Sequence, residues 1–319
     1  MSLTKKRLTY RPLEYKEAHD YWLKQQQAHW LGTEVALTQD VLDWETKLTK
    51  SEKSVIGGIL KGFTQTEVLV NNYWNHVAHW FPVPEVAMAA TTMAAYETIH
   101  MHAYSLLDET LGFNDYATYI AEPAIKARLD RLLDPHGKTR EEKAKSLAVF
   151  SAFTEGVSLF SSFAVLLHFS RFNKLKGVSQ IVSYSIRDEV LHADFGCYLF
   201  RKLMDDNQDL WTDEFKKSLY QAARDTVELE DKFLDKVFED GEIEHLQKDD
   251  VKNFIRNRAN AQLGKLGLKQ NWKNIDKDAL KRMDWFDVIA AGTRLDDFFF
   301  VKPHDYSKGV VNFDGIFDE

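Results

Sequence analysis

Residues 85–107 read EVAMAATTMAAYETIHMHAYSLL, and this stretch is the clearest indication of a helical protein. Small and apolar side chains occupy most positions, so a helix formed here is apolar nearly all round and belongs in a protein interior. We expect it to run over 84–111 and to stop at Gly112. Within it, Glu97 precedes His100 by three residues, which places a carboxylate and an imidazole on one helical face.

The same Glu-x-x-His spacing occurs twice more in the chain. Glu189 and His192 lie between the segment IVSYSI and an apolar LFR region, which is again typical of a buried helix. Glu242 and His245 lie in the acidic stretch FEDGEIEHLQKDD, where solvated charge is the natural explanation. We expect the Glu189 pair to join the Glu97 pair in the core, and the Glu242 pair serves as an internal control.

Two more carboxylates interrupt apolar helices: Glu67 within GFTQTEVLV and Glu155 within SAFTEGVSLFSSFAVLLHF. Taken singly, a buried Glu is better explained by a salt bridge, and a His by capping or packing. Together, four glutamates and two histidines in the order Glu, Glu-x-x-His, Glu, Glu-x-x-His match the way helical bundles hold two iron or manganese ions. Four carboxylates also neutralise two divalent cations, and zinc, calcium or magnesium would prefer other ligands.

The composition favours an all-α protein. Of its 319 residues 44% are hydrophobic and 28% charged, and 15 Gly and 6 Pro leave few of the turn clusters that punctuate β proteins. The net charge of −8 argues against a nucleic-acid partner, because phosphate binding needs clustered Lys and Arg. Cys197 is the single cysteine, which excludes an intramolecular disulfide and a Cys-based zinc site.

The start of the chain, MSLTKKRLTYRPLEY, lacks the apolar segment of a signal peptide. We find no stretch of about 20 apolar residues that could span a bilayer. The sequence therefore predicts a cytoplasmic protein without a membrane segment.

Helical periodicity and polar breaks divide the chain into segments without a domain linker or internal repeat. The predicted helices cover residues 49–78, 84–111, 116–133, 140–172, 178–205, 211–240 and 246–265. Beyond the DDFFF motif the sequence VKPHDYSKGVVNFDGIFDE has Pro, Gly and isolated aromatics but no helical pattern. We expect one helical domain over 1–300 and a flexible tail over 301–319.

With these residues in place, the chain resembles the small subunit of class I ribonucleotide reductase from about Tyr15 to the tail. The motifs that carry the resemblance are YETIHMHAY at 96–104, the Glu155 segment and IRDEVLH at 186–192. The resemblance implies a ferritin-like bundle with additional helices. It also implies metal ligands at Glu67, Glu97, His100, Glu155, Glu189 and His192.

The implied reaction starts at an oxidised metal pair, which generates a radical in a separate large subunit that reduces ribonucleotides to deoxyribonucleotides. Reduction of the substrate in this family needs several cysteines, and this chain has only Cys197, so it needs the large subunit as a partner. The resemblance further suggests a homodimer.

By resemblance, Trp30 and Asp188 continue a radical path from His100, and Tyr306 in the tail hands the oxidant to the large subunit. Trp30 is explained equally well as a core anchor. Phe313 and Phe317 give the acidic tail two apolar anchors for a groove on the partner, while a disordered end is the simpler alternative.

Tyr104, one helical turn after His100, occupies the position of the radical-bearing tyrosine of the family. Two departures argue against such a radical here: Glu67 stands where tyrosyl-radical members usually carry Asp, and Ser185 stands where they place an apolar residue. Leu159 and Phe163 would still supply apolar wall. The departures resemble the dimanganese branch (class Id), in which the tyrosine is unmodified. Manganese is therefore favoured, with iron or a mixed manganese–iron pair as the alternative.

Three other functions are compatible with a helical bundle that carries these residues. A ferritin-like dimetal oxidase or monooxygenase would act on a small organic substrate and would not need Trp30, Asp188 or the tail. A metal store or a purely structural helical protein would lack catalysis altogether. A store should take up many ions per chain, and a structural protein should bind none.

Overall fold

The chain folds into a helical bundle, seen in a computed structural model that describes residues 2–130 and 137–290. Within these two ranges no strand forms, and the one extended pairing is a bridge between Ile243 and Leu246. This confirms the all-α prediction. The elements are α1 Lys16–Gln27, η1 Gly32–Glu34, α2 Thr38–Thr46, α3 Lys50–Trp80, α4 Pro84–Leu111, α5 Tyr116–Ala121, α6 Pro123–Asp130, α7 Arg140–Leu147, η2 Ala148–Ser158, α8 Phe160–His168, η3 Phe169–Phe172, α9 Lys176–Asp206, η4 Gln208–Leu210, α10 Asp213–Val237, α11 Lys248–Lys265 and α12 Lys277–Arg282.

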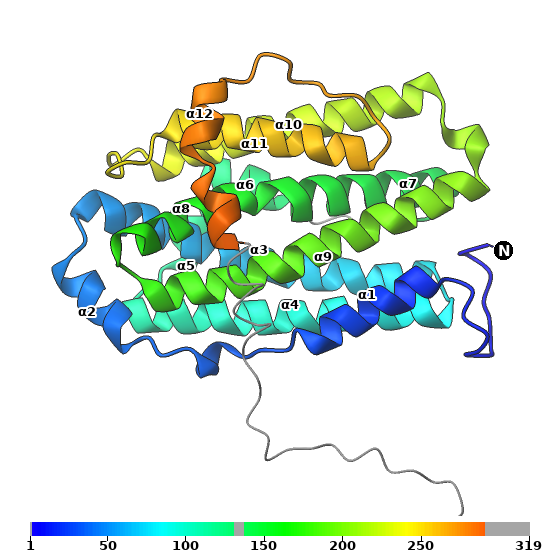
Figure 1. The fold of residues 1–319 in the computed structure, drawn as a ribbon, viewed down its shortest axis with the longest axis horizontal. Helices are drawn as coiled ribbons and strands as arrows, with labels where there is room; N and C mark the ends of the chain where they lie inside the picture. Colours follow the sequence, from blue (N-terminus) through cyan, green and yellow to red (C-terminus); the bar gives the residue numbers. More distant parts are fainter. Residues whose placement is uncertain (1, 131–136, 291–319) are drawn as a thin grey trace, which may run out of the picture.

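Four long helical runs form the centre of the bundle: α3, α4, the run from α7 to η3, and α9 (Figure 1). Helices α3 and α4 pack along each other, and α9 packs against the run that contains η2. Helices α10 and α11 cover η2 on one side, while α1 lies against α4 and α9 on the other. Each central run therefore has neighbours on several sides, as its apolar sequence requires.

The ends of α3 and α4 follow from local sequence. Thr49 and Glu52 form a reciprocal capping box that starts α3. Helix α4 begins at Pro84 and ends at Gly112, which takes the left-handed conformation with φ 83° that glycine tolerates. The helices predicted at 49–78 and 84–111 are thus confirmed within about two residues at each end.

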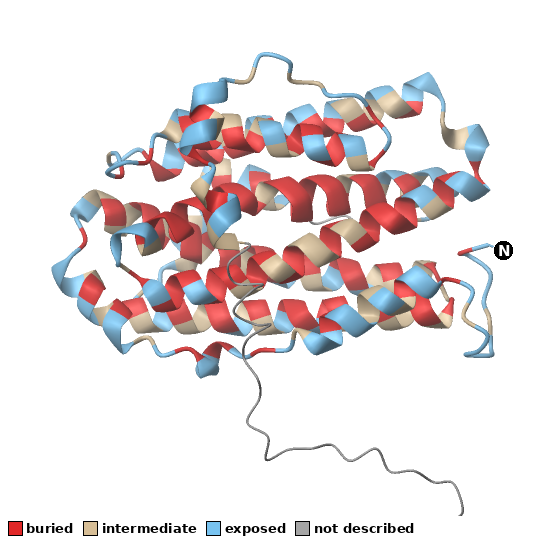
Figure 2. Ribbon diagram, in the orientation of Figure 1, coloured by how far each residue is buried: buried red, intermediate tan, exposed pale blue. Residues whose placement is uncertain are grey.

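The segment 140–172 is continuous but not a single α-helix. Its middle, η2, is a π-helix of 11 residues. The same run contains a window apolar enough to cross a membrane by length and composition, so the expectation that no such stretch exists is wrong. Of that window, 89% is buried inside the bundle, and Figure 2 shows the same run buried along most of its length. Its apolarity is thus accounted for by core packing.

The predicted helix at 116–133 is also corrected, because the chain forms α5 and α6 with a break at Glu122. Pro123 disfavours helical conformation in the residue before it, and Glu122 accordingly adopts φ −63° and ψ 130°. Pro123 then serves as the first residue of α6.

Helices α1, α2 and α12 were not predicted from the sequence. Helix α2 binds the N-terminal end of α9. Its Asp40 carboxylate accepts hydrogen bonds from the backbone N–H groups of Gly177 and Val178, at 3.1 and 2.8 Å. Asp43 accepts one from Leu175 at 3.0 Å. Two carboxylates of α2 therefore cap α9 at its positive end and fix the position of that helix.

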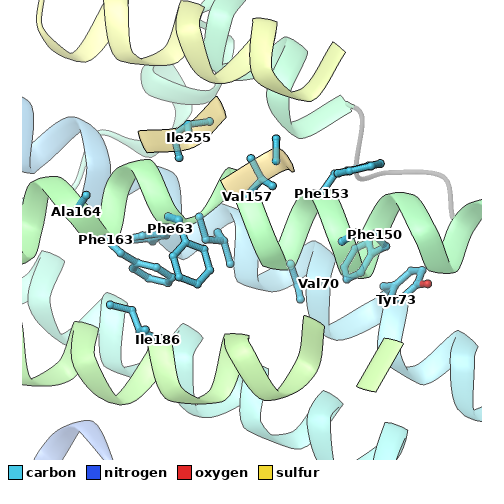
Figure 3. Close-up of a cluster of buried hydrophobic side chains, with 14 of the residues drawn as sticks. Phe63, Val70, Tyr73, Phe150, Phe153, Val157, Phe163, Ala164, Ile186 and Ile255 are labelled. Atoms are coloured by element: carbon cyan, nitrogen blue, oxygen red, sulfur yellow. The ribbon is translucent and has the colours of Figure 1, made fainter. Parts of the chain in front are cut away.

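An aromatic and aliphatic cluster fills the interior between the central runs (Figure 3). Phe63 of α3 lies 5.1 Å from Phe163 of α8 between ring centroids, and Ile186 of α9 is buried in the same core. Fully burying one such side chain stabilises the fold by roughly 1.5–3 kcal/mol.

Candidate metal centre

The six residues predicted as metal ligands come from the four central runs. Glu67 belongs to α3, Glu97 and His100 to α4, Glu155 to η2, and Glu189 with His192 to α9. All six side chains are fully buried. The internal control behaves differently: Glu242 and His245 lie outside any helix, and 62% of the His245 side chain is exposed. Burial within an apolar helix therefore distinguishes the Glu97 and Glu189 motifs from the Glu242 copy, which has the same Glu-x-x-His spacing.

The six side chains converge into two overlapping groups. Glu67, Glu97, His100 and Glu189 form one group, in which the potential ligand atoms all lie within 4.8 Å of one another. The second group, defined by the same distance, consists of Glu97, Glu155, Glu189 and His192. Glu97 and Glu189 belong to both groups. The geometry is therefore that of two adjacent four-ligand sites that share two carboxylates.

The distances around the two imidazoles show how closely the groups approach. Nδ1 of His100 lies 3.1 Å from Oε2 of Glu97 and 3.1 Å from Oε1 of Glu189. Nδ1 of His192 lies 2.7 Å from Oε1 of Glu97 and 3.6 Å from Oε2 of Glu189. Each shared carboxylate therefore has one oxygen near His100 and the other near His192.

Most polar atoms of the cluster have no hydrogen-bond partner. Among residues 2–130 and 137–290, both carboxylate oxygens of Glu67, Glu97 and Glu189 are buried without one, as are Oε2 of Glu155 and Nδ1 of both histidines. In the described ranges the ion pairs of these carboxylates involve only His100 and His192, so the salt-bridge explanation with Lys or Arg does not apply. Buried polar atoms left unpaired are costly. A set of oxygen and imidazole donors aimed at common points therefore fits two iron or manganese ions.

Burial and the charges of neighbouring side chains shift the pKa values of these residues. Burial raises the pKa of Glu67 to about 8 and that of Glu155 well above its usual range. Burial would lower the pKa of His192, but the negative charges of Glu97 and Glu189 raise it to about 10. The pKa of His100 is raised for a similar reason, chiefly by Asp188. Protons therefore replace cations when the carboxylates have no metal.

The π-helical segment η2 presents Glu155 to the cluster. A π-turn inserts extra backbone into a helix and occurs often at functional sites. Arg258 of α11 donates its Nε–H to the carbonyl of Gly156 at 3.2 Å, and Gln262 fills the space where a Cβ at Gly156 would lie. Trp74 of α3 donates its indole N–H to Oε1 of Glu155 at 2.8 Å. Oε2 of Glu155 is left free to face the cluster.

A hydrogen-bonded chain leads away from His100. Oδ2 of Asp188 lies 3.1 Å from Nε2 of His100 and accepts the indole N–H of Trp30 at 2.8 Å. Oδ1 of the same carboxylate accepts a hydrogen bond from Gln25 at 3.0 Å. Trp30 is only 3% exposed, so it is a core anchor, and its hydrogen bond makes it a partner of Asp188 as well. The structure therefore brings together the three residues that the resemblance placed on one path.

Tyr104 is fully buried close to the first ligand group. Its ring stacks on Phe63 with 4.6 Å between centroids, and its hydroxyl makes no hydrogen bond among the described residues. Ser185 lies nearby, but its hydroxyl donates to the carbonyl of Ile181 at 3.3 Å. Burial, reinforced by the charge of Glu67, raises the pKa of Tyr104 well above its usual range. Leu159 and Phe163 are buried as expected.

Two residues near the cluster were missed by the sequence analysis. Gln25 lies in the polar segment KEAHDYWLKQQQ, where nothing distinguishes it from its exposed neighbours. Trp74 could have been found, since it lies seven residues after Glu67 and therefore on the same face of α3. Tyr306, Phe313 and Phe317, and with them the tail at 301–319, lie outside the described residues.

This chain is similar to known subunits of ribonucleotide reductase. The family profile "Ribonucleotide reductase, small chain" matches residues 7–278. A probable ribonucleoside-diphosphate reductase small subunit from Invertebrate iridescent virus 3 is 32% identical over 97% of this chain and 86% of its own length. A ribonucleoside-diphosphate reductase subunit beta from Chlamydia pneumoniae is 27% identical over 87% of each chain.

Solved structures support the fold. The dimanganese(II) form of NrdF from Streptococcus sanguinis superposes with a TM-score of 0.74 at 21% identity, covering 88% of this chain and all of that one. The ribonucleotide reductase R2 subunit from Clostridium botulinum gives a TM-score of 0.73 at 19% identity, covering 89% of this chain and 91% of that one. At such identities the similarity concerns the arrangement of helices.

Proposed function

The chain belongs to the ribonucleotide reductase small-chain family, and from this premise we propose that it carries a two-metal centre whose oxidised form starts the reductase reaction. The observation that supports this most directly is the pair of ligand groups that share Glu97 and Glu189. In this proposal Glu67 and His100 complete one metal site, and Glu155 and His192 complete the other. When bound, the metal pair supplies a strong one-electron oxidant.

The residues around the centre would direct that oxidant. Asp188 accepts hydrogen bonds on both sides, so it holds the imidazole of His100 and the indole of Trp30 in one fixed arrangement. Burial of all three excludes water that would otherwise compete for these bonds. We assign Trp30 and Asp188 to the start of the radical path out of the centre. Gln25 positions Asp188 through its second oxygen.

The path must leave this chain, because its single cysteine cannot support reduction of a ribonucleotide. We assign the acceptor to a large subunit, with the tail at 301–319 as the docking peptide, Phe313 and Phe317 as its apolar anchors, and Tyr306 as the residue that passes the oxidant on. Residues 1–300 would then form the metal-carrying domain.

We favour manganese in both sites and an unmodified Tyr104. A tyrosine that stores a radical must lose its proton, and the Tyr104 hydroxyl makes no hydrogen bond in the described ranges. Ser185 adds a polar group where a radical would need apolar shielding. Iron, or one iron with one manganese, is the alternative pair, and the ligand set fits all three. We further propose a homodimer in the cytoplasm.

Two of the other functions have less support. A metal store has no use for the chain from His100 through Asp188 to Trp30, and neither does an oxidase acting on a small substrate. The match to one family over residues 7–278 likewise favours the reductase subunit.

Elemental analysis and electron paramagnetic resonance of the protein from its native host test the proposal together. We expect about two manganese ions per chain and a spectrum of coupled manganese without an organic radical. A tyrosyl radical beside iron would contradict the manganese assignment, and a chain without bound metal would contradict the function itself.

A further inference from the structure

A row of aromatic side chains leads from the Glu155 side of the centre toward the surface, and the path through Trp30 does not use it. The ring centroid of Trp74 lies 5.7 Å from that of His192, and its indole N–H binds Glu155. The ring of Tyr73 follows at 5.6 Å from Trp74. Trp80, at the last residue of α3, follows at 5.8 Å from Tyr73. The first two side chains are buried, whereas Trp80 is half-buried.

We propose that Trp74, Tyr73 and Trp80 form a second electron route, through which a small organic one-electron donor at the surface reduces the oxidised metal pair. The proposal rests on the proposed function, because it needs an oxidised centre beside Glu155. In each event the donor loses one electron, the metal pair gains one, and the aromatic side chains return to their starting state. The route would reset or protect the centre when no large subunit accepts its oxidising equivalent.

The environment of Trp74 suits this role. Its ring carries positive charge while it lacks an electron, and the hydrogen bond to the carboxylate of Glu155 stabilises that charge. The proton can therefore remain on the indole nitrogen during the transfer. An indole without such an acceptor in an apolar core would be harder to oxidise.

Tyr73 serves as a bridging ring between the two indoles. Oxidation of a phenol releases its proton, and the buried Tyr73 hydroxyl has no hydrogen-bond partner in the described part of the chain. The ring is held by Phe150 of η2, which stacks on it at 3.5 Å between centroids. Figure 3 shows the two side chains next to each other. Tyr73 thus keeps a fixed contact with both tryptophans without becoming a radical itself.

This route is separate from the path through Trp30. The aromatic row ends at Glu155 and His192, which belong to the second ligand group. Trp30 is linked through Asp188 to His100, which belongs to the first group. A substitution on one route should therefore leave transfer along the other intact.

The test uses the metal-loaded, oxidised small subunit without a large subunit, with ascorbate as the donor. The rate at which the oxidised metal signal disappears is followed by stopped-flow absorption. We expect Trp80→Phe to slow this reduction several-fold. Trp211→Phe is the matched control, because Trp211 is also half-buried but, among the aromatic rings of residues 2–130 and 137–290, contacts only Phe200 and Phe215. An unchanged rate in Trp80→Phe, or equal slowing in Trp211→Phe, would overturn the route.

Two further variants test the bridging role of Tyr73 and the separation of the two routes. Tyr73→Phe should keep the wild-type rate because the ring remains, and slowing there would overturn the bridging role. Trp30→Phe should also reduce at the wild-type rate, and slowing there would overturn the separation of the routes. Metal content is measured first in every variant. A wild-type chain without two ions contradicts the proposed function, whereas two ions with a neutral Trp80→Phe contradict this route alone.

Discussion

Trp30 donates its indole N–H to Oδ2 of Asp188 at 2.8 Å, across 158 positions of sequence. The same oxygen lies 3.1 Å from Nε2 of His100, so one carboxylate atom connects an indole near the N-terminus with a proposed metal ligand. A core tryptophan needs only one polar partner for its N–H. Because this partner, Asp188, also contacts His100, we place Trp30 on the radical path.

Replacing Trp30 by Phe should abolish reductase activity while both metal ions stay bound. Phe fills much of the same space but has neither the N–H group nor the readily oxidised indole. Activity is measured with the large subunit present, and metal by elemental analysis. Trp22→Phe on α1 is the control and should behave as wild type. Substantial activity in Trp30→Phe would exclude the indole from the path.

Single substitutions of the ligands should change metal content in a graded way. Glu97 belongs to both ligand groups, so Glu97→Gln should remove both ions, whereas Glu67→Gln should spare the second site. Glutamine has nearly the same shape as a protonated glutamate, the form that burial favours without metal, so both variants should fold. Elemental analysis gives the stoichiometry. Glu242→Gln should keep both ions, and equal losses in Glu67→Gln and Glu97→Gln would contradict shared carboxylates.

Tyr104→Phe should leave reductase activity close to that of the wild type. The stacked contact with Phe63 remains, and the hydroxyl that is lost makes no hydrogen bond to the described part of the chain. Because removing an unsatisfied buried hydroxyl relieves a cost of about 1–3 kcal/mol, the free energy of unfolding should be unchanged or higher. Loss of activity, together with a tyrosyl radical in the unmodified protein, would instead assign the radical to Tyr104.

His168 predicts a dependence of stability on pH. Its side chain is 1% exposed, and burial lowers its pKa from 6.5 to about 4. Between these two values the unfolded chain binds a proton that the folded chain does not. The contribution is therefore fully present above pH 6.5 and is lost progressively toward pH 4, by about 2 kcal/mol at pH 5.

His168→Gln should remove this part of the pH dependence and keep a donor for the carbonyl of Glu244. Chemical denaturation at pH 7.5 and pH 5 measures the change in the free energy of unfolding. The exposed His79 offers the control His79→Gln, which should lose as much stability as the wild type does. Equal pH dependence in His168→Gln and wild type would show that His168 titrates normally.

The convergence of the six buried side chains could be predicted from the sequence because its signal is local. A carboxylate such as Glu67 or Glu155 inside an apolar helix is costly wherever the helix packs, so its partner could be inferred before the fold was known. The break before Pro123 was also readable, since proline restricts the preceding residue, and it was nevertheless missed.

Other features depend on tertiary contacts. Gln25 is buried because α1 lies against α4 and α9, and its polar neighbours carry no sign of this. The π-helix η2 has the apolar composition of a buried α-helix. Nothing in its sequence therefore indicated a π-helical conformation. The roles of Asp40 and Asp43 likewise depend on where α9 begins.

Anomalous X-ray diffraction from crystals of the manganese-loaded protein, recorded at the manganese absorption edge, shows whether two cations share Glu97 and Glu189. We predict two peaks about 3.5–4 Å apart, each between the shared carboxylates of Glu97 and Glu189. A single peak, or peaks away from these two side chains, would contradict a pair of cations held in common by the four central runs.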